Sequence, residues 1–376
     1  MALNLIRNSK VYFTTNLDSN NRVNASGFTT SNTWRIEVLE GFTFSQATTT
    51  ENITVNEAGP TPTRGQRAFN TALDPVEFSM STYIRPYYLE AGASDSISAP
   101  EKVLWNALMG SGALGSGAWV ETPGVSGGTT VCAPTVSNSN VHQLQAFGLV
   151  VVLDTLVYYI DNCALESATI DFGLDAIATI AWAGRGTRLR QSETKPTLVA
   201  GTNFVEVPTT AAFIANKLST TTVKAGIGGT GESYTVPITG GSITYSNNLT
   251  YLTPAVLGVV NKPVTYFTGT RAISGTLTAY MRSDAASKFT AELQSDILTG
   301  SDTASDTKYY VKVEVGGITK ANRVEIEVPA AMLSIPEVNA EQLISTTINF
   351  TGQAYTGADY DLTQANEVEV AYFAAP

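Results

Sequence analysis

Two ten-residue stretches decide the fold that the sequence predicts: Val76–Arg85, which reads VEFSMSTYIR, and Ile273–Arg282, which reads ISGTLTAYMR. In the first, Val76, Phe78 and Met80 alternate with Glu77, Ser79 and Ser81. A period of two is expected of a strand with one buried face and one polar face. Both stretches are therefore predicted to be half-buried antiparallel strands, and their likeness suggests an internal repeat.

The same alternation recurs along the chain and predicts further strands at 169–172, 180–182, 323–328 and 348–350. Helical spacing is found at two places only. Residues 100–110 begin with Pro100 and end with Gly110, and residues 284–298 carry an apolar residue every four positions with Gly300 closing the run. This pattern of predicted strands and helices is therefore typical of a mainly β protein with one helix in each half.

The order of these landmarks is the same in the two halves of the chain. Trp34–Ser45 parallels Tyr234–Ser246, an aromatic residue that begins a strand, a glycine turn and a second strand. Each Tyr-x-Arg strand then leads to a helix, a hairpin and a strand that ends at Gly184 or Gly352. We expect two tandem β-sandwich or β-barrel domains, each with one flanking α-helix.

The expected boundaries follow from these landmarks. They are an N-terminal arm at 1–33, a first domain at 34–191 with a long loop at 110–139, a linker or arm at 192–233, and a second domain at 234–376. The loop and the linker are rich in Gly, Ser and Thr, and segments of such length usually have a function.

Charge and hydropathy exclude several classes of protein. The 376 residues contain 22 Lys and Arg against 33 Asp and Glu, so the net charge is −11. An acidic balance argues against a surface that grips phosphates, because such grip comes from basic clusters. No run of about 18 apolar residues and no secretory signal is visible, so we expect no membrane partner and synthesis in a cytoplasm.

The sequence offers little material for catalysis. Cys132 and Cys163 are too few for a disulfide framework, and His142 is the single histidine. Gly226–Gly231 has the spacing of a dinucleotide-binding loop, but the residues that follow predict a strand where a helix would be needed. We therefore predict no catalytic residues, no metal and no cofactor, and a protein that is not an enzyme.

Three segments together resemble phage tail tube proteins. They are Phe78–Arg85 before a short helix, Ala164–Phe172, and Ala178–Gly184, and the resemblance extends over both halves. It implies two tail-tube-like domains in a structural virion protein of the tail, assembled in the host cytoplasm. In that family, sheets from neighbouring subunits join into a hollow barrel, and rings of subunits stack around a lumen for DNA.

The resemblance also implies partners and sites. A duplicated chain is expected to self-assemble as stacked trimeric, pseudo-hexameric rings, with hexameric rings as the alternative. Further expected partners are a tape-measure protein, a tail terminator or baseplate, DNA in transient passage, and a sheath if the tail has one. The polar parity of the strands supplies candidate lumen-facing residues: Glu77, Ser79, Ser81, Ser274, Thr276, Thr278, Glu325 and Glu327.

The apolar residues of the N-terminal arm are candidates for docking on a neighbouring subunit, because they would be wasted in solvent. They are Leu3, Leu5, Ile6, Val11, Tyr12 and Phe13. Packing on the parent domain is the alternative. Two other classes of protein also stay open: another β-sandwich virion protein, such as a head decoration or baseplate hub protein, and a carbohydrate-binding β-sandwich protein.

Overall fold

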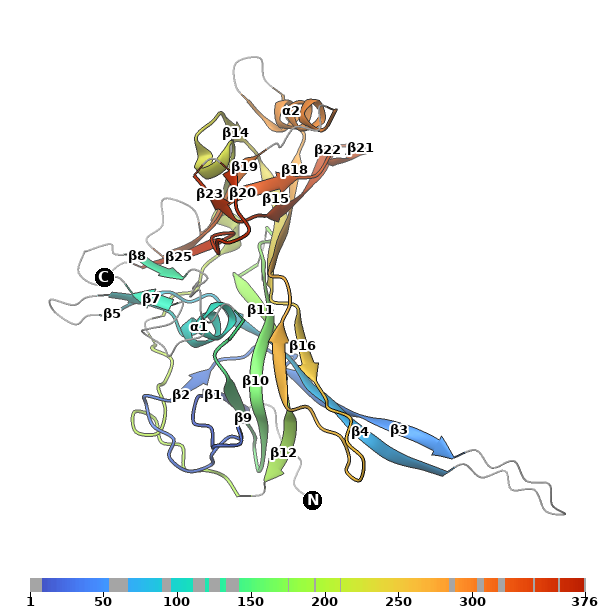
Figure 1. Cartoon of the computed structure of the whole chain (residues 1–376). Helices are drawn as coiled ribbons and strands as arrows, with labels where there is room; N and C mark the ends of the chain where they lie inside the picture. The colour runs from blue at the N-terminus through green and yellow to red at the C-terminus, as the bar shows by residue number, and fades with distance from the viewer. Residues whose placement is uncertain are drawn as a thin grey trace, which may run out of the picture.

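The computed structural model confirms a mainly β chain (Figure 1). It describes residues 9–53, 67–89, 96–110, 119–121, 129–132, 142–174, 176–192, 194–209, 211–283, 288–302, 308–316, 322–340, 342–357 and 359–374. Antiparallel pairing dominates, as the alternating pattern predicts, and the alternating apolar residues are buried, from Val76, Phe78 and Met80 to Ile348 and Phe350.

One antiparallel sheet of eight strands runs through the whole molecule, and we call it the wall sheet. Its strands, in spatial order, are β3 (Thr43–Ile53), β4 (Arg67–Tyr83), β11 (Thr179–Gly186), β10 (Leu156–Asp171), β15 (Ile238–Ser246), β18 (Ala272–Tyr280), β22 (Ile344–Gly352) and β21 (Glu337–Ala340). The first four strands belong to the first half of the chain and the last four to the second half. The pairing of β10 with β15 joins the halves.

Each half adds a second layer on one face of the wall sheet. In the first half the order is β2 (Thr33–Ile36), β1 (Ser9–Thr14), β9 (Phe147–Leu153), the start of β10, and β12 (Arg188–Ser192). In the second half it is β14 (Ser233–Thr235), β13 (Thr220–Ala225), β19 (Tyr309–Val315), the start of β20 (Arg323–Leu333), and β25 (Glu369–Phe373), which continues into β8 (Thr129–Cys132) and β7 (Trp119–Glu121).

The same order of strand pairings is therefore found twice along the chain. The second-half counterparts of β1, β2, β3, β4, β9, β10, β11 and β12 are β13, β14, β15, β18, β19, β20, β22 and β25. Three segments that were expected to be an arm, a loop and a linker contain strands. The arm 1–33 contains β1, the loop 110–139 contains β7 and β8, and the linker 192–233 contains β13. The domain boundaries stay a prediction.

The remaining elements are short. The two α-helices of the described chain are α1 (Lys102–Met109), which ends before Gly110 as predicted, and α2 (Thr290–Asp302). The second helix was expected to end at Gly300, but Gly300 lies inside it. Three hairpins pair β16 (Leu249–Leu252) with β17 (Thr265–Thr268), β5 (Tyr87–Leu89) with β6 (Ser96–Ser98), and β23 (Tyr355–Thr356) with β24 (Asp359–Tyr360). Two 3₁₀ turns are Asn216–Leu218 and Ile227–Gly229.

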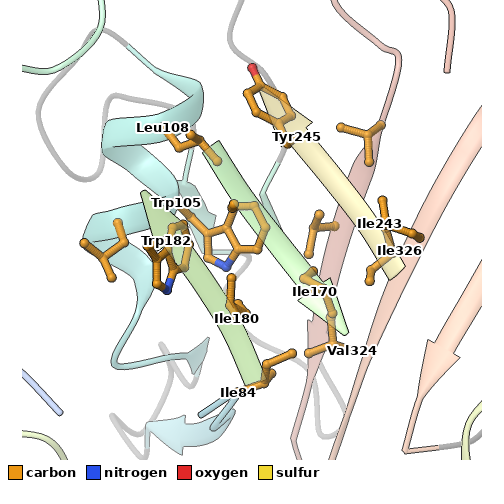
Figure 2. Packing of buried hydrophobic residues seen from close by; sticks show 14 of the residues in the cluster. Ile84, Trp105, Leu108, Ile170, Ile180, Trp182, Ile243, Tyr245, Val324 and Ile326 are labelled. Atoms are coloured by element: carbon orange, nitrogen blue, oxygen red, sulfur yellow. The ribbon is translucent and has the colours of Figure 1, made fainter. Parts of the chain in front are cut away.

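The larger of two hydrophobic clusters among the described residues fills the space between the layers and includes residues from both halves (Figure 2), and a smaller one lies around Tyr12, Phe28 and Phe204 of the first half. Trp105 of α1 packs edge-on against Trp182 of β11, with ring centroids 5.0 Å apart. Its indole N–H donates to the hydroxyl of Tyr372, 2.7 Å away on β25 in the other half. Buried Trp and Tyr need such polar partners, and here the partner also joins the halves. The two halves are thus packed as one body.

The strand β10 serves both layers because it bends at Asp161–Cys163. Asn162 adopts a left-handed φ of 47°, and the register with β9 shifts between Ile160 and Cys163. A local irregularity of this kind lets one strand leave a sheet and enter another. Asp161 at this bend is 1% exposed and accepts hydrogen bonds from Arg190 at 2.6 and 2.7 Å and from the Val23 amide at 2.9 Å.

Loss of the Asp161 carboxylate should therefore destabilise the chain. We expect Asp161→Ala to lower the free energy of unfolding by about 2–4 kcal/mol, because it leaves the Arg190 guanidinium and the Val23 amide without their acceptor. Urea denaturation measures the difference. The matched control is Asp359→Ala, whose ion pair with Lys308 lies at the surface, with the carboxylate 90% exposed, and should change stability by less than about 1 kcal/mol. Equal losses in both variants would contradict the assignment.

Glu101, the residue before α1, is a second buried carboxyl group. It is 2% exposed, and burial raises its pKa to about 7, although the Arg85 amide and the Tyr372 hydroxyl favour the charged form. The folded chain therefore holds a proton on Glu101 in the pH range where the unfolded chain, with a pKa near 4.5, has lost it. Folding is favoured by this group at low pH and the benefit is lost as the pH rises to about 7.

Removing this titration should stabilise the protein at neutral pH. We expect Glu101→Gln to gain stability relative to the natural chain as the pH rises from 5 to 8, by on the order of 3 kcal/mol at most. Urea denaturation at both pH values measures this, with Glu40→Gln at an exposed position as the control. A difference between the Glu101→Gln variant and the natural chain that does not change with pH would show that Glu101 is ionised in the folded state.

Candidate functional site

The polar face of the wall sheet is the most extended feature that the sequence-predicted residues build. Residues directly paired across a sheet lie on the same face, so the register identifies this face row by row. One row crosses six strands as Ser81, Ala181, Thr169, Thr244, Ser274 and Thr351. The next row is Tyr83, Thr179, Asp171, Ser242, Thr276 and Asn349. We call this face the wall face.

Six of the eight predicted lumen-facing residues are brought together on the wall face. They are Glu77, Ser79 and Ser81 on β4 and Ser274, Thr276 and Thr278 on β18. The two groups come from distant parts of the sequence and share the face because β11, β10 and β15 connect their strands. That this face lines a lumen stays a prediction, which is developed below.

Hydroxyl groups on the wall face hydrogen-bond across neighbouring strands. Thr169 and Thr244 approach to 2.9 Å across the junction of the halves, Thr43 and Ser79 approach to 2.8 Å, and Ser242 and Thr276 approach to 3.3 Å. Such cross-strand pairs stabilise a sheet and leave the face with small, uncharged polar groups.

Charge on the wall face is sparse and mainly negative. Along the body of the sheet its described residues include the carboxylates of Glu77, Glu166, Asp171 and Glu337 and the cation Arg185, and a second cation, the exposed Arg67, lies at the outer end of β4, paired with Ile53 of β3. The Arg185 guanidinium lies 3.1 Å from Glu166 and 3.7 Å from Glu77, so its charge is balanced by two carboxylates. A polyanion approaching the body of this face would therefore meet, at Arg185, a positive charge that two carboxylates balance.

The opposite face of the wall sheet is apolar and closely packed. Its glycines allow aromatic rings to lie directly on the backbone: a Cβ at Gly184 would come within 2.4 Å of the Phe78 ring, and one at Gly275 within 2.2 Å of the Phe350 ring. The core side therefore holds the sheet against the second layer and α1, while the wall face stays free of that packing (Figure 1).

Glu325 and Glu327 do not belong to the wall face. They lie on β20 where it pairs with β19, in the second layer. Lys312 bridges them at 2.7 and 3.3 Å, and Glu325 is only 7% exposed. The expectation that Glu325 faces an open channel is therefore wrong, because its carboxylate is used inside the chain. The alternation of Glu325 and Glu327 with apolar residues predicted a strand correctly, but it did not predict which sheet contains that strand.

The expected docking residues of the N-terminal arm are also corrected in part. Val11, Tyr12 and Phe13 are each at most 2% exposed and form part of β1, which pairs with β2 and β9 of the same chain. Phe13 stacks on Phe147 with centroids 4.4 Å apart. These three residues pack on their own domain, which was the alternative interpretation. Leu3, Leu5 and Ile6 lie outside the described residues.

Within the described ranges no group of three or more His, Cys, Asp or Glu is placed to hold a metal ion. None of the helices in the same ranges is long and apolar enough to cross a membrane. His142 Nδ1 lies 3.1 Å from the Thr268 hydroxyl, and Gly226–Gly231 contains a 3₁₀ turn that precedes strand β14, not the α-helix of a phosphate-binding loop.

Several wall-face residues were missed by the sequence analysis. Thr169, Asp171, Ser242 and Thr244 occupy the centre of the face, where the halves meet. The alternation of Thr169 and Asp171 with Ile170 was visible in the sequence and marks them as the polar parity of a strand. What the alternation could not reveal is that β10 pairs with β15, because that contact joins two halves of the chain.

Both edges of the wall sheet remain open in the isolated chain. Among the described residues, β3 pairs only with β4, and β21 pairs only with β22. Open edges offer backbone groups to another strand. Apolar side chains are exposed around the β21 edge: Met332, Ile335, Val338, Leu343 and Ile344. The site is thus a polar sheet face with two open edges among the described residues.

Comparison with known proteins agrees with this architecture. The sequence model of a family described as phage tail tube protein matches residues 23–354. A curated relative, tail tube protein pb6 of Escherichia phage T5, is 29% identical over 360 residues, which cover 93% of this chain and 72% of the relative. Since the family model matches most of the chain, this protein belongs to the phage tail tube protein family and is a structural component of the virion tail.

Proposed function

We propose that three copies of this chain close into a ring whose inner wall is the wall face, and that stacked rings form a lumen for the passage of DNA. The observation that carries the proposal is the continuous eight-stranded sheet with a polar face and two open edges. Pairing the β3 edge of one chain with the β21 edge of the next would remove both edges at once.

The width of the resulting barrel favours three chains. Strands lie about 4.8 Å apart, so 24 strands give a circumference of about 115 Å and a backbone diameter of about 37 Å, which strand tilt widens further. Side chains occupy part of this width and leave room for a duplex about 20 Å across. Six chains would give a diameter of about 75 Å before tilt, far wider than DNA requires. Hexameric rings are therefore the less favoured alternative.

The chemistry of the wall face suits passage and not binding. A duplex carries one negative charge per about 1.7 Å, and unpaired Lys or Arg on the wall would hold it by counterion release. Arg185 is balanced by Glu166 and Glu77, and the central rows carry hydroxyl groups. In this arrangement the wall repels DNA weakly and hydrates it, so DNA slides.

Within this proposal the chain is not an enzyme, and it needs no cofactor. Its partners are other copies of itself, a tape-measure protein inside the lumen during assembly, a terminator and a baseplate at the two ends, and a sheath if the tail is contractile. The two halves of each chain would act as two tandem, equivalent wall units, which the repeated order of strand pairings supports.

Ring size gives the direct test of the proposed assembly. We expect the purified chain to form rings of three 39.8 kDa copies, alone or stacked into hollow filaments, since each copy supplies eight wall strands. Native mass spectrometry of isolated rings and negative-stain electron microscopy measure this. Rings of six chains would contradict the trimeric wall, and a chain that stays monomeric under all assembly conditions would contradict the function.

The wall face can be tested with charge. We expect assembled Ser79→Lys/Thr276→Lys tubes to retain short duplex DNA, with affinity falling at least tenfold between about 50 and 200 mM salt, because each lysine adds a phosphate contact inside the bore. Ser79→Gln/Thr276→Gln tubes are the size-matched neutral control and should retain no more DNA than the natural protein. Co-sedimentation with labelled duplex measures retention. Lysine tubes that bind no DNA would place these residues away from the lumen.

A further inference from the structure

An exposed apolar turn projects from one end of the wall sheet. Strands β16 and β17 form a hairpin whose connection carries Val256, Leu257, Val259, Val260 and Val264, all at least 42% exposed, with Leu257 at 99%. We call these five residues the apolar knob. Isolated surface aliphatic residues are ordinary, but five within nine positions of one turn form a patch that water does not favour.

The knob is held in place by hydrogen bonds on three sides. The Val256 amide donates to Asn261 Oδ1 at 2.8 Å across the turn, and Gly258 supplies the left-handed φ of 85°. Backbone groups of Asn261 bond to Thr71 and Leu73 on β4 at 3.0 and 2.9 Å. The knob is thus presented in a fixed position, which lowers the entropy cost of docking.

The base of the hairpin is anchored at the bend of β10. The Tyr251 hydroxyl donates to the carbonyls of Arg185 and Asn162 at 2.8 and 3.2 Å, and the Tyr266 hydroxyl donates to the carbonyl of Leu144 at 2.9 Å. Tyr251 and Tyr266 therefore point into the protein, whereas Phe267 of β17 is 53% exposed and the aliphatic residues of the turn point away from the protein. The turn is a built projection and not a loose loop.

A second exposed apolar cluster lies at the opposite end of the wall sheet. Leu174 and Ile177 connect β10 to β11, and Phe213 and Leu218 lie beside them, since the amides of Ala178 and Asn216 bond to the carbonyls of Ile214 and Ala176. All four side chains are 45–55% exposed. We call them the apolar rim. The register places the end of β10 and the start of β16 at opposite ends of the sheet.

We propose that the apolar knob of one ring docks on the apolar rim of the chain in the next ring. This inference rests on the proposed function. A tube grows by head-to-tail repetition of one subunit, so a surface at one end must fit a different surface at the other end. The knob and the rim are exposed apolar surfaces at the two ends of the wall sheet, and docking would bury both in a second copy of this chain.

The knob also breaks the equivalence of the two halves. Its counterpart in the first half is the β3–β4 hairpin, whose described outer part carries Thr48, Thr49, Thr50 and Asn70 and a single large exposed apolar residue, Phe69. One knob in the described part of each chain gives three per trimeric ring in the proposed assembly. The wall can therefore have nearly sixfold symmetry, whereas the contacts between stacked rings repeat three times per turn. These contacts would give neighbouring rings one preferred rotational register.

The second half has a second set of exposed apolar residues that competes with the apolar rim as the docking site for the knob, and it belongs to the β21 edge. The exposed residues at that end of the sheet are Val338 on β21, Leu343 between β21 and β22, and Ile344 at the start of β22. This edge is the one that closes the ring in the proposed assembly. The rim of the first half is the one left free for the next ring.

Filament length tests the knob. We expect Leu257→Asp to leave trimeric rings intact and to shorten filaments at least tenfold, because a charge at the docked position opposes stacking and not ring closure. Thr48→Asp, on the outer part of the β3–β4 hairpin, is the matched control and should leave length unchanged. Negative-stain microscopy measures both. Natural protein that forms no rings would contradict the proposed function and the knob with it; Leu257→Asp filaments of natural length would contradict the knob alone.

Disulfide trapping identifies the receptacle. Leu257→Cys/Leu218→Cys filaments, oxidised and run without reductant, should give a ladder of cross-linked chains, whereas Leu257→Cys/Leu343→Cys and each single variant should not. The single variants control for Cys132 and Cys163. A ladder only from the Leu343 pair, or no ladder from either pair in intact filaments, would overturn the assignment of the rim.

Discussion

The pairing of β10 with β15 is the contact on which the rest of the structure depends. Five residue pairs, from Ser167 with Ser246 to Asp171 with Ser242, connect β10 of the first half to β15 of the second half. Without this ladder the halves would present two four-stranded sheets with four open edges. With it, one polar face extends across eight strands and only two edges remain for other chains.

Contacts on the core side of the wall sheet also strengthen the junction between the two halves. Trp105 and Tyr372 belong to different halves and share a buried hydrogen bond, and β8 of the first half pairs with β25 of the second. Relative motion of the halves would break these contacts and expose the indole N–H, which is costly in an apolar environment. Rigidity here matters for function, because an open sheet can close into a barrel of defined diameter only if its curvature is fixed within each subunit.

The sequence predicted local features well and long-range pairing poorly, for identifiable reasons. The parity of Val76, Phe78 and Met80 specified which side of β4 is buried, since a strand has only two faces. The parity of Glu325 specified a polar side of β20 but not the sheet, because β20 bends from one layer to the other. Register was also out of reach: Trp182 pairs with Met80 while Phe350 pairs with Gly275, so the repeat is offset by two residues from the alignment of Val76–Arg85 with Ile273–Arg282. Burial of Val11, Tyr12 and Phe13 was missed because β1 pairs with β9, more than 130 residues away.

In the proposed ring, two similar but unequal halves in one chain would allow a division of labour that six identical subunits could not have. The proposed wall needs its units to be alike, because every strand would present its polar side to the same lumen, and the rows across β4, β10, β15 and β18 carry hydroxyl groups in both halves. The ends of the sheet are under no such demand. In the first half the described part of the β3–β4 hairpin is mostly polar, and in the second half the β16–β17 hairpin carries Leu257 on a fixed turn. A ring of three such chains can keep a smooth bore while its ends offer fewer and more specific contacts, and specificity at the ends is what sets a single register between rings.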